Sequence, residues 1–278
     1  MSRSCFVMAL AVLALAGCMS PSGPCVESAS GHAVTLEEMA ERLAEMDVVF
    51  LGEEHDSDLG HAMQLETTKL LLERRGRIAL SLEMLEADCQ LELDRYLAGE
   101  LSESRFLDRA RPWPNYHEHY RPAVELARRE GLPVLAANVP RPLAARVARE
   151  GLAAVFSQPM MPFDVRTDPG AYRERFEEAM GNHGGITTMN KVFAAQVVKD
   201  EKMAEAIDYF LEKEPGTLVV HWVGKFHSDY RLGTVERLLR RRPGLRVAVV
   251  TMNSSTREPG RLRPEDRSAA DFVWLVGD

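Results

Sequence analysis

The chain has 278 residues, of which 34 are Lys or Arg and 42 are Asp or Glu, giving a formal net charge of −8. Proteins that bind nucleic acid carry basic surfaces, so this acidic balance argues against a nucleic-acid partner. The length suits one α/β domain with insertions, which is large enough to bury a sizeable core.

The N-terminus has the pattern of an export signal. Arg3 precedes an apolar run from Phe6 to Ala16, which is too short to cross the ~30 Å core of a bilayer as a helix. Leu15-Ala16-Gly17-Cys18 fits the bacterial lipobox. We therefore predict that residues 1–17 are a lipoprotein signal peptide and that Cys18 is lipidated; the alternative is an ordinary signal peptide cut after a small residue.

The residues after the lipobox predict where the protein is held. Met19 is not the Asp that commonly retains lipoproteins at the inner membrane, so we expect an outer-membrane anchor. Residues 18–34 are rich in Ser, Pro and Gly and are predicted to be a flexible tether. A disulfide between Cys25 and Cys89 is conceivable after export, but one lies in this tether and the other in a predicted helix.

The remaining residues, 35–278, are predicted to form the folded domain. Thr35 and Glu38 form a capping-box pattern at the start of a helix over 36–46. Five short apolar runs predict buried strands over 47–51, 77–82, 133–137, 217–223 and 245–251. Helical patterns alternate with these strands over 57–75, 117–130, 186–213 and 234–242, and Phe272 to Val276 is expected to be a last edge strand.

Two segments interrupt this alternation and predict helical insertions. Residues 86–112 contain two short helical patterns joined at Gly99, and residues 159–185 contain a loop, a helix near 171–180 and a glycine turn. Nearly continuous apolar strands are typical of a parallel sheet covered on both faces. We therefore predict an α/β fold, with a mostly parallel sheet flanked by helices on both faces and a small helical cap.

Acidic side chains and histidines follow the predicted strands. In an open parallel sheet, ligands bind beyond the carboxyl ends of the strands. Glu53, Glu54 and His55 follow the first strand, Glu83 the second and His227 the fourth. The sequence therefore predicts a functional site at this edge of the sheet.

His55 and His227 each end a Gly-x-x-His segment, and three interpretations remain open. His55, His227 and Glu83 are candidate ligands of a divalent metal, with Glu54 or Glu83 as the catalytic carboxylate of a hydrolase. Alternatively, the glutamates orient the histidines in a site without metal. The third interpretation is that these histidines only bond to loop backbone.

The segment from Trp113 to Pro122 is rich in aromatic residues and histidine. Such a composition suits a flat aromatic ligand, because Tyr or His can bind iron while another ring stacks on a macrocycle. His61, one turn into the helix after the first Gly-x-x-His segment, is a further candidate for the same crevice. The alternative is a surface loop that begins a helix.

Six segments, taken in order, resemble the ChaN family of haem-binding bacterial lipoproteins, within the wider group that includes Tiki/TraB and erythromycin-esterase-like proteins. The resemblance spans about residues 47 to 251. It is carried by Leu51–Asp56 with His61, Leu82–Met84, Tyr120–Pro122, Ala137–Arg141, Gln196 with Asp200–Ala204, and Gly224–Tyr230.

The resemblance implies a haem-binding protein at the outer membrane that takes part in haem or iron uptake or storage. It implies haem at a homodimer interface, with tyrosine as the iron ligand and histidine nearby, and an outer-membrane haem or iron receptor as a partner. The candidate ligands are, in order of preference, Tyr230, Tyr120 and Tyr116.

The other candidate cofactor-binding residues are His227, His55, His61, Glu53, Glu83, Asn138 and Arg141. Arg121, Arg141 and Lys225 are available for the propionates. The resemblance to Tiki proteins keeps the metal-dependent hydrolase as the alternative function.

Overall fold

A computed structural model of the chain describes residues 25–181, 185–254 and 262–276. The predicted signal peptide, Cys18 and the first part of the predicted tether lie outside the described residues. Within the described ranges, no helix is both long enough and apolar enough to cross a membrane.

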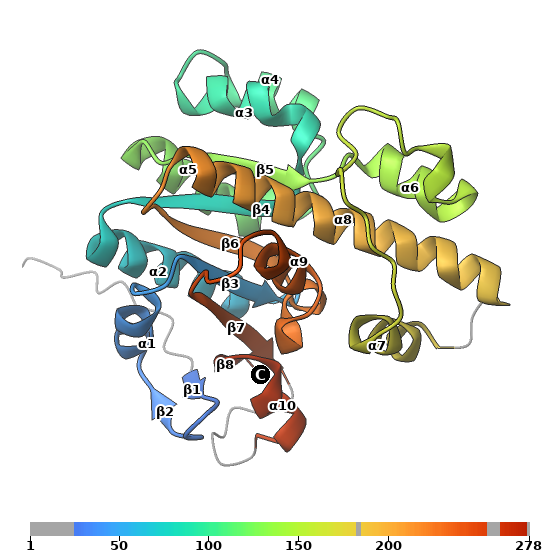
Figure 1. Cartoon of the computed structure of the whole chain (residues 1–278). Coiled ribbons are helices and arrows are strands. Elements are labelled where there is room, and N and C mark those ends of the chain that lie inside the picture. The colour runs from blue at the N-terminus through green and yellow to red at the C-terminus, as the bar shows by residue number, and fades with distance from the viewer. Residues whose placement is uncertain (1–24, 182–184, 255–261, 277–278) are drawn as a thin grey trace, which may run out of the picture.

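The fold is built on an eight-stranded mixed sheet with the order β2-β1-β8-β7-β3-β6-β4-β5 (Figure 1). The strands from β3 to β8 run parallel to one another, whereas β1 is antiparallel to both β8 and β2. This confirms the predicted α/β class. The strands are β1 (Cys25–Glu27), β2 (Ala33–Val34), β3 (Val48–Glu53), β4 (Ile78–Glu86), β5 (Val134–Asn138), β6 (Leu218–Gly224), β7 (Val247–Asn253) and β8 (Phe272–Leu275).

Helices cover both faces of the sheet, as the continuous apolar strands predicted. The α-helices of the described residues are α1 (Leu36–Leu43), α2 (Asp58–Arg75), α3 (Gln90–Leu97), α4 (Glu103–Ala110), α5 (Arg121–Glu130), α6 (Arg141–Glu150), α7 (Ala171–Met180), α8 (Gly185–Lys213), α9 (Thr234–Arg241) and α10 (Pro264–Ala269). Short single turns lie at Ala87–Cys89, Tyr116–Tyr120, Leu152–Ala154, Lys225–His227 and Asp229–Arg231.

Alternate residues of β3 enter two separate cores, because successive side chains of a strand point to opposite faces. Val49 and Leu51 pack in the core that contains α1, α2 and α5. Val48 and Phe50 pack in the core made with α8 and α9. Burying both faces in this way fixes the register of β3, and so the position of the residues that follow it.

The N-terminal edge of the domain differs from the prediction. Residues 25–34, predicted as part of the tether, form β1 and β2. Cys25 pairs with Trp274 across the β1–β8 ladder, and Cys25 and Val26 are fully buried. The predicted edge strand, β8, is therefore covered by β1. Both strands are too short to produce a clear alternation in a Ser- and Gly-rich sequence.

The two predicted insertions have the expected helices. The first contains α3 and α4, and the second contains α7, whose Tyr172 and Phe176 pack on α8. α7 and the N-terminal half of α8 project beyond the sheet (Figure 1). Helices α6 and α10 were not predicted, and α6 buries only Ala144 and Val147, which explains its weak apolar pattern. Cys25 and Cys89 are both buried and unpaired.

Candidate functional site

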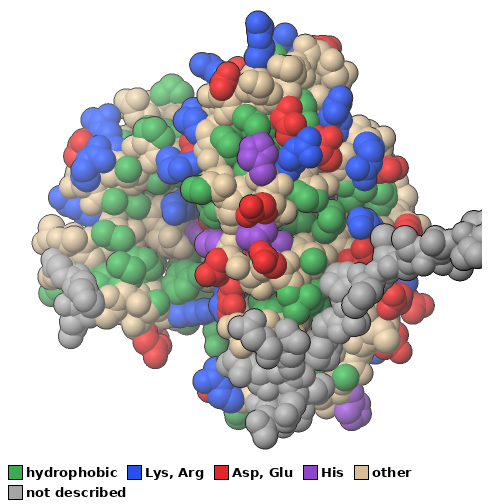
Figure 2. All heavy atoms as spheres, turned by 180° about the vertical axis from the view of Figure 1, so that it is seen from behind, with side chains coloured by type: hydrophobic (Ala, Val, Ile, Leu, Met, Phe, Trp, Pro, Cys, Tyr) green, Lys and Arg blue, Asp and Glu red, His purple; other side chains and the backbone are tan. Residues whose placement is uncertain are grey.

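The carboxyl ends of β3, β4 and β6 bring the predicted acidic residues and histidines together. Figure 2 shows histidine side chains at the middle of one face, with Asp and Glu side chains next to them. Successive residues after β3 take part in different groups of contacts. Glu53 and His55 bond to each other, whereas Glu54 lies in a hollow beside β7.

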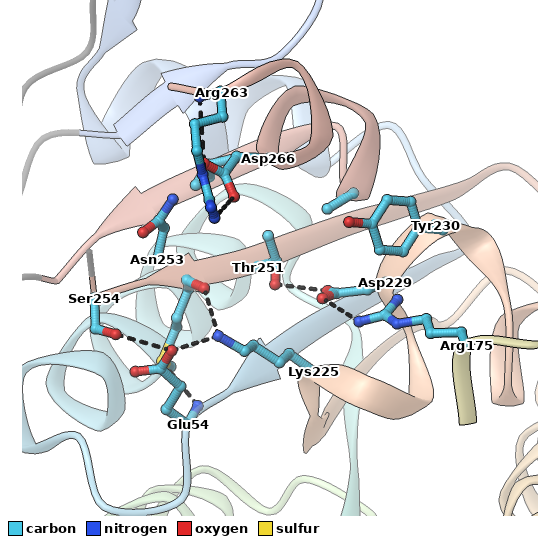
Figure 3. A pocket seen from close by; sticks show the side chains of 13 residues that line it. Glu54, Arg175, Lys225, Asp229, Tyr230, Thr251, Asn253, Ser254, Arg263 and Asp266 are labelled. Atoms are coloured by element: carbon cyan, nitrogen blue, oxygen red, sulfur yellow. Dashed lines mark hydrogen bonds and ion pairs between the residues drawn. The ribbon is translucent and has the colours of Figure 1, made fainter. Parts of the chain in front are cut away.

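The hollow beside β7 has a volume of about 330 Å³ and is lined mainly by polar and charged side chains (Figure 3). Glu54 forms an ion pair with Lys225, whose ammonium group also lies 3.3 Å from the carbonyl oxygen of Met252. On another side of the hollow, Arg263 pairs with Asp266. Each of these charges therefore has a partner of opposite sign at the wall.

Tyr230 is the one of the three candidate tyrosines whose side chain is exposed, at 38%. It has a φ of 60°, an uncommon conformation for a residue with a side chain, and its hydroxyl points into the hollow (Figure 3). The guanidinium of Arg175 lies 4.4 Å from the centre of its ring. A second hollow of about 380 Å³ also has Tyr230 and Arg175 in its wall.

Tyr116 and Tyr120 are buried in the core, with exposed fractions of 1% and 0%. The hydroxyl of Tyr120 donates to Glu53 Oε1 at 2.7 Å. Burial, the first cause, raises the pKa of both phenols, and in Tyr120 the charge of Glu53 adds to this effect. In this conformation, neither phenol oxygen is available to a ligand outside the core.

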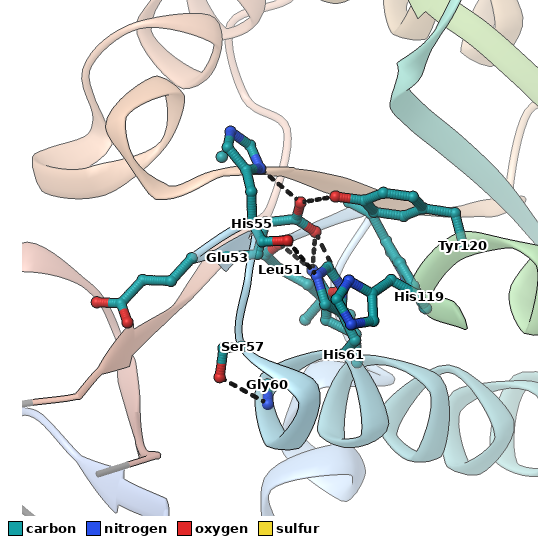
Figure 4. Close-up of polar contacts among 12 residues, drawn as sticks. Leu51, Glu53, His55, Ser57, Gly60, His61, His119 and Tyr120 are labelled. Carbon is teal, nitrogen blue, oxygen red and sulfur yellow. Dashed lines mark hydrogen bonds and ion pairs between the residues drawn. The ribbon is translucent and has the colours of Figure 1, made fainter. Parts of the chain in front are cut away.

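Glu53 is a fully buried carboxylate that is held by three side chains (Figure 4). Besides the Tyr120 hydroxyl, the amide of Gln64 donates to Glu53 Oε2 at 2.9 Å. His55 Nδ1 lies 2.8 Å from Glu53 Oε1. These three contacts fix the orientation of the Glu53 carboxyl group.

The imidazole of His55 is consequently oriented by Glu53, while its other nitrogen is free. Its side chain is 49% exposed, and Nε2 has no hydrogen-bond partner among the described residues. Burial lowers the pKa of His55, but the hydrogen bond to Glu53 and the charges of Glu83 and Glu53 raise it overall. The edge of Trp113 lies against the ring, at 4.8 Å between centroids.

A second group of charged residues, formed by Glu83, His227 and Asp200, lies beside His55. Glu83 Oε2 accepts from the backbone N–H of Gly224 at 2.7 Å, and Glu83 Oε1 lies 3.4 Å from His227 Nε2. His227 Nδ1 lies 2.7 Å from Oδ1 of Asp200, which is also fully buried. Burial opposes all these charges, yet the two carboxylates raise the pKa of His227 to about 10.

Gly224 allows the two groups to approach each other. A Cβ at this position would lie 2.8 Å from His55 Cε1 and 3.4 Å from Glu83 Oε2. The first of these distances is shorter than van der Waals contact, so any side chain here would displace the His55 ring. The glycine of the second Gly-x-x-His segment therefore serves close packing beside His55, in addition to the turn.

The three predicted metal ligands are near one another, but they are bonded to protein groups. His227 uses both ring nitrogens, toward Asp200 and Glu83, and His55 uses one toward Glu53. In the part of the chain that the structure describes, no group of three or more His, Cys, Asp or Glu side chains is arranged to hold a metal ion.

The other predicted residues lie outside the walls of the two hollows that Tyr230 shares. His61 is buried and bonds to Gln64 and to the backbone of His55. Asn138 accepts from the N–H of Val139. Arg141 pairs with Glu86, and Arg121 with Glu103. These residues connect elements of the fold, and Lys225 is the one predicted cation that lines a hollow with Tyr230.

Several residues at the site were not predicted. Asp200, on α8, holds His227 and also accepts from Tyr172 of α7 at 2.6 Å. Gln64, on α2, holds Glu53. Arg175, on α7, lies over Tyr230. For Asp200 and Gln64 the available signal was a polar residue among the apolar residues of a buried helix face, which indicates a partner inside the core. Arg175 lies on a mostly polar helix and gave no such signal.

Comparison with known proteins gives one family match. A family model described as "Haem-binding uptake, Tiki superfamily, ChaN" matches residues 39–238. No curated protein gave a significant match.

Among solved structures, one titled "Cofacial heme binding to ChaN of Campylobacter jejuni" has a TM-score of 0.72 at 16% identity, covering 91% of this chain and 96% of the other. The type III effector HopBA1 has a TM-score of 0.51 at 12% identity, covering 87% and 93%. An erythromycin esterase, EreC, has a TM-score of 0.49 at 14% identity, covering 77% and 72%. At these identities the two structures with TM-scores above 0.5 show a shared fold.

Proposed function

The chain belongs to the ChaN family of haem-binding uptake proteins in the Tiki superfamily, and from this premise we propose that it binds haem with the phenol oxygen of Tyr230 as the iron ligand. The observation that carries the proposal is the position of this side chain. Tyr230 is exposed, and its hydroxyl points into a hollow. The other two candidate phenols are buried.

The surroundings of Tyr230 fit a haem. A phenolate is an anionic oxygen ligand, and tyrosine is an established axial ligand of haem iron. The guanidinium of Arg175 lies 4.4 Å from the centre of the Tyr230 ring, where it holds the ring in place. Tyr230 lies in the wall of both hollows, which have volumes of about 330 and 380 Å³. Haem would supply the iron centre, and the chain would bind and orient it.

A second copy of the chain would cover the outer face of the haem. The solved structure of ChaN from Campylobacter jejuni is titled for cofacial haem binding. The open site at Tyr230 supports a comparable arrangement here, in which two copies form a homodimer on binding haem. We further propose that Cys18 is lipidated and anchors the protein at the outer membrane, where it would exchange haem or iron with an uptake receptor.

Tyr230→Phe tests the iron ligand. Removing the phenol oxygen removes the bond to iron but keeps the ring under Arg175. We expect haemin to bind at least about tenfold more weakly, equivalent to ~1.4 kcal/mol, with loss of the tyrosinate charge-transfer absorption. Tyr209→Phe is the matched control, because Tyr209 is also exposed, at 62%, and also lies beside a cation, Lys213. Equal effects of the two substitutions on the haemin titration would contradict the proposal.

A second function is supported by the Glu53–His55 pair. A buried carboxylate that orients a half-exposed imidazole, with the outer nitrogen free, is the arrangement of a general base that activates water. This geometry favours hydrolysis of an ester or peptide. It requires no change in the contacts of His227 with Asp200 and Glu83. The alternative function thus remains a hydrolase, with His55 as the base and Glu53 as the residue that positions it.

His55→Asn tests this second function. General-base catalysis is typically worth 10²- to 10⁴-fold, so we expect kcat for a responsive ester or peptide to fall by about that factor. His117→Asn, at another exposed histidine, should leave kcat unchanged. Absence of turnover by the wild-type chain across a panel of esters and peptides, with and without added divalent metal, would exclude the hydrolase.

A further inference from the structure

The hollow beside β7 lies at a point where the chain changes direction across the sheet. From β3 the chain continues to β4 on one side, whereas from β7 it continues to β8 on the other. In open α/β sheets, the crevice outside the carboxyl ends of two such strands is where ligands bind. Glu54 follows β3, and Thr251, Met252 and Asn253 end β7, all in the wall of this hollow.

Two cationic side chains of the wall, Lys225 and Arg263, have N–H groups without a partner among the described residues. The ammonium group of Lys225 carries three N–H bonds, of which Glu54 and the Met252 carbonyl take two. The guanidinium of Arg263 uses Nε and Nη2 for Asp266, and its Nη1 has no partner among the described residues.

The acidic groups of the wall are each paired with at least one donor, although Glu54 Oε2 has no partner among the described residues. Glu54 accepts from Lys225 and Ser254, and Asp229 accepts from Thr251 and Arg175. Asp266 accepts from Arg263. A ligand that enters this hollow can therefore bond to cationic N–H groups of Lys225 and Arg263, and the group that suits such donors is a carboxylate.

The orientation of the Tyr230 side chain places this hollow next to the proposed iron ligand. Its hydroxyl points into the hollow (Figure 3), whose wall also contains Lys225 and Arg263. A haem whose iron is bound by this oxygen would lie across the mouth of the hollow. Its propionates are flexible side chains at one edge of the ring, so they could turn inward toward the wall.

We propose that the hollow binds a haem propionate, with Lys225 and Arg263 as the donors. This inference rests on the proposed haem function and adds to it a determinant of orientation. The propionate edge of the haem lies over β7 and α10, and the vinyl edge lies toward the second hollow, beside α7. A free carboxylate in solution has the same chemistry and is the other possible occupant.

Haemin and haemin dimethyl ester, delivered from the same detergent solution, separate the propionate charges from the rest of the ligand. We expect the purified full chain to bind haemin at least about tenfold more tightly than the ester, as for one charge-assisted hydrogen bond. Arg263→Gln and Lys225→Met should each reduce this preference, mainly by weakening the binding of haemin. Affinity for the ester should change less than twofold.

Arg246→Gln is the matched control. Arg246 pairs with Asp47 with a side chain 53% exposed, compared with 62% for Arg263 paired with Asp266, but it precedes β7 at the opposite end of the strand. It should keep the full preference for haemin. Circular dichroism and thermal unfolding of each variant identify any loss caused by misfolding.

Two results would overturn the inference. Equal affinity of the wild type for haemin and the ester overturns it, as does a preference that survives in both variants. If millimolar glutarate weakens haemin binding but not ester binding, the hollow also accepts free carboxylates. If Tyr230→Phe keeps the wild-type iron spectrum, the proposed ligand is wrong, while the comparison of haemin with the ester still reports on the hollow.

Discussion

Asp200→Asn is expected to reduce the free energy of unfolding by about 3 kcal/mol, because it leaves a buried cation with half of its counter-charge. Asp200 is fully buried and lies 2.7 Å from His227. It also accepts from Tyr172 at 2.6 Å and Thr234 at 2.8 Å. The amide keeps the volume of the side chain but not its charge, so the loss measures mainly electrostatics. Urea unfolding at pH 7, followed by circular dichroism, is the measurement.

Asp208→Asn provides a control on the same helix. Asp208 pairs with Arg242 at the surface, where the two side chains are 29% and 36% exposed, and exposed pairs contribute about 0 to 1 kcal/mol. The two substitutions are chemically identical and both lie in α8, so helix propensity does not distinguish them. A loss at position 200 no larger than that at position 208 would show that the buried charges are not needed for stability.

Much of the sheet was predictable from the sequence. Apolar runs such as 47–51 and 217–223 are long enough and apolar enough to be strands buried on both faces, and β3 and β6 confirm them. Parallel strands end at the same edge, so the meeting of Glu83, His55 and His227 followed from that fold. The sequence could not predict that Glu53 and His55 would contact each other while Glu54 would lie in the hollow beside β7. Both faces of β3 are apolar, so the pattern does not distinguish the two sides of the strand.

The burial of Tyr116 and Tyr120 could not be predicted from the sequence. Tyr116 and Tyr120 lie in a π-helical turn at the start of α5, and the 3.6-residue period used for helices does not place side chains correctly in such a turn. Both were candidates for an exposed site, yet both are core residues. Asp200, by contrast, was not predicted to be a site residue. It lies within a long helix, and its partner His227 is distant in sequence.

Stability is also expected to fall as the pH rises from about 6.5 to 8.5, by up to ~1.4 kcal/mol per pH unit. His227 has an ordinary pKa of 6.5, but in the fold Glu83 and Asp200 outweigh the cost of burial and raise its pKa to about 10. Over this range the unfolded chain releases the proton while the folded chain keeps it. The stabilisation that His227 provides is therefore complete below pH 6.5 and is lost as the pH approaches 10.

Other titratable groups also affect how stability depends on pH. His55 also has a raised pKa, so it contributes in the same direction. The thiols of Cys25 and Cys89, with an ordinary pKa of 9.0 that burial raises to about 12, add a similar slope at higher pH, which is why the range stops at 8.5. His227→Gln should flatten most of the slope in urea-unfolding measurements, whereas His55→Gln should flatten less of it. An unchanged slope in His227→Gln would mean that the charge of His227 does not stabilise the fold.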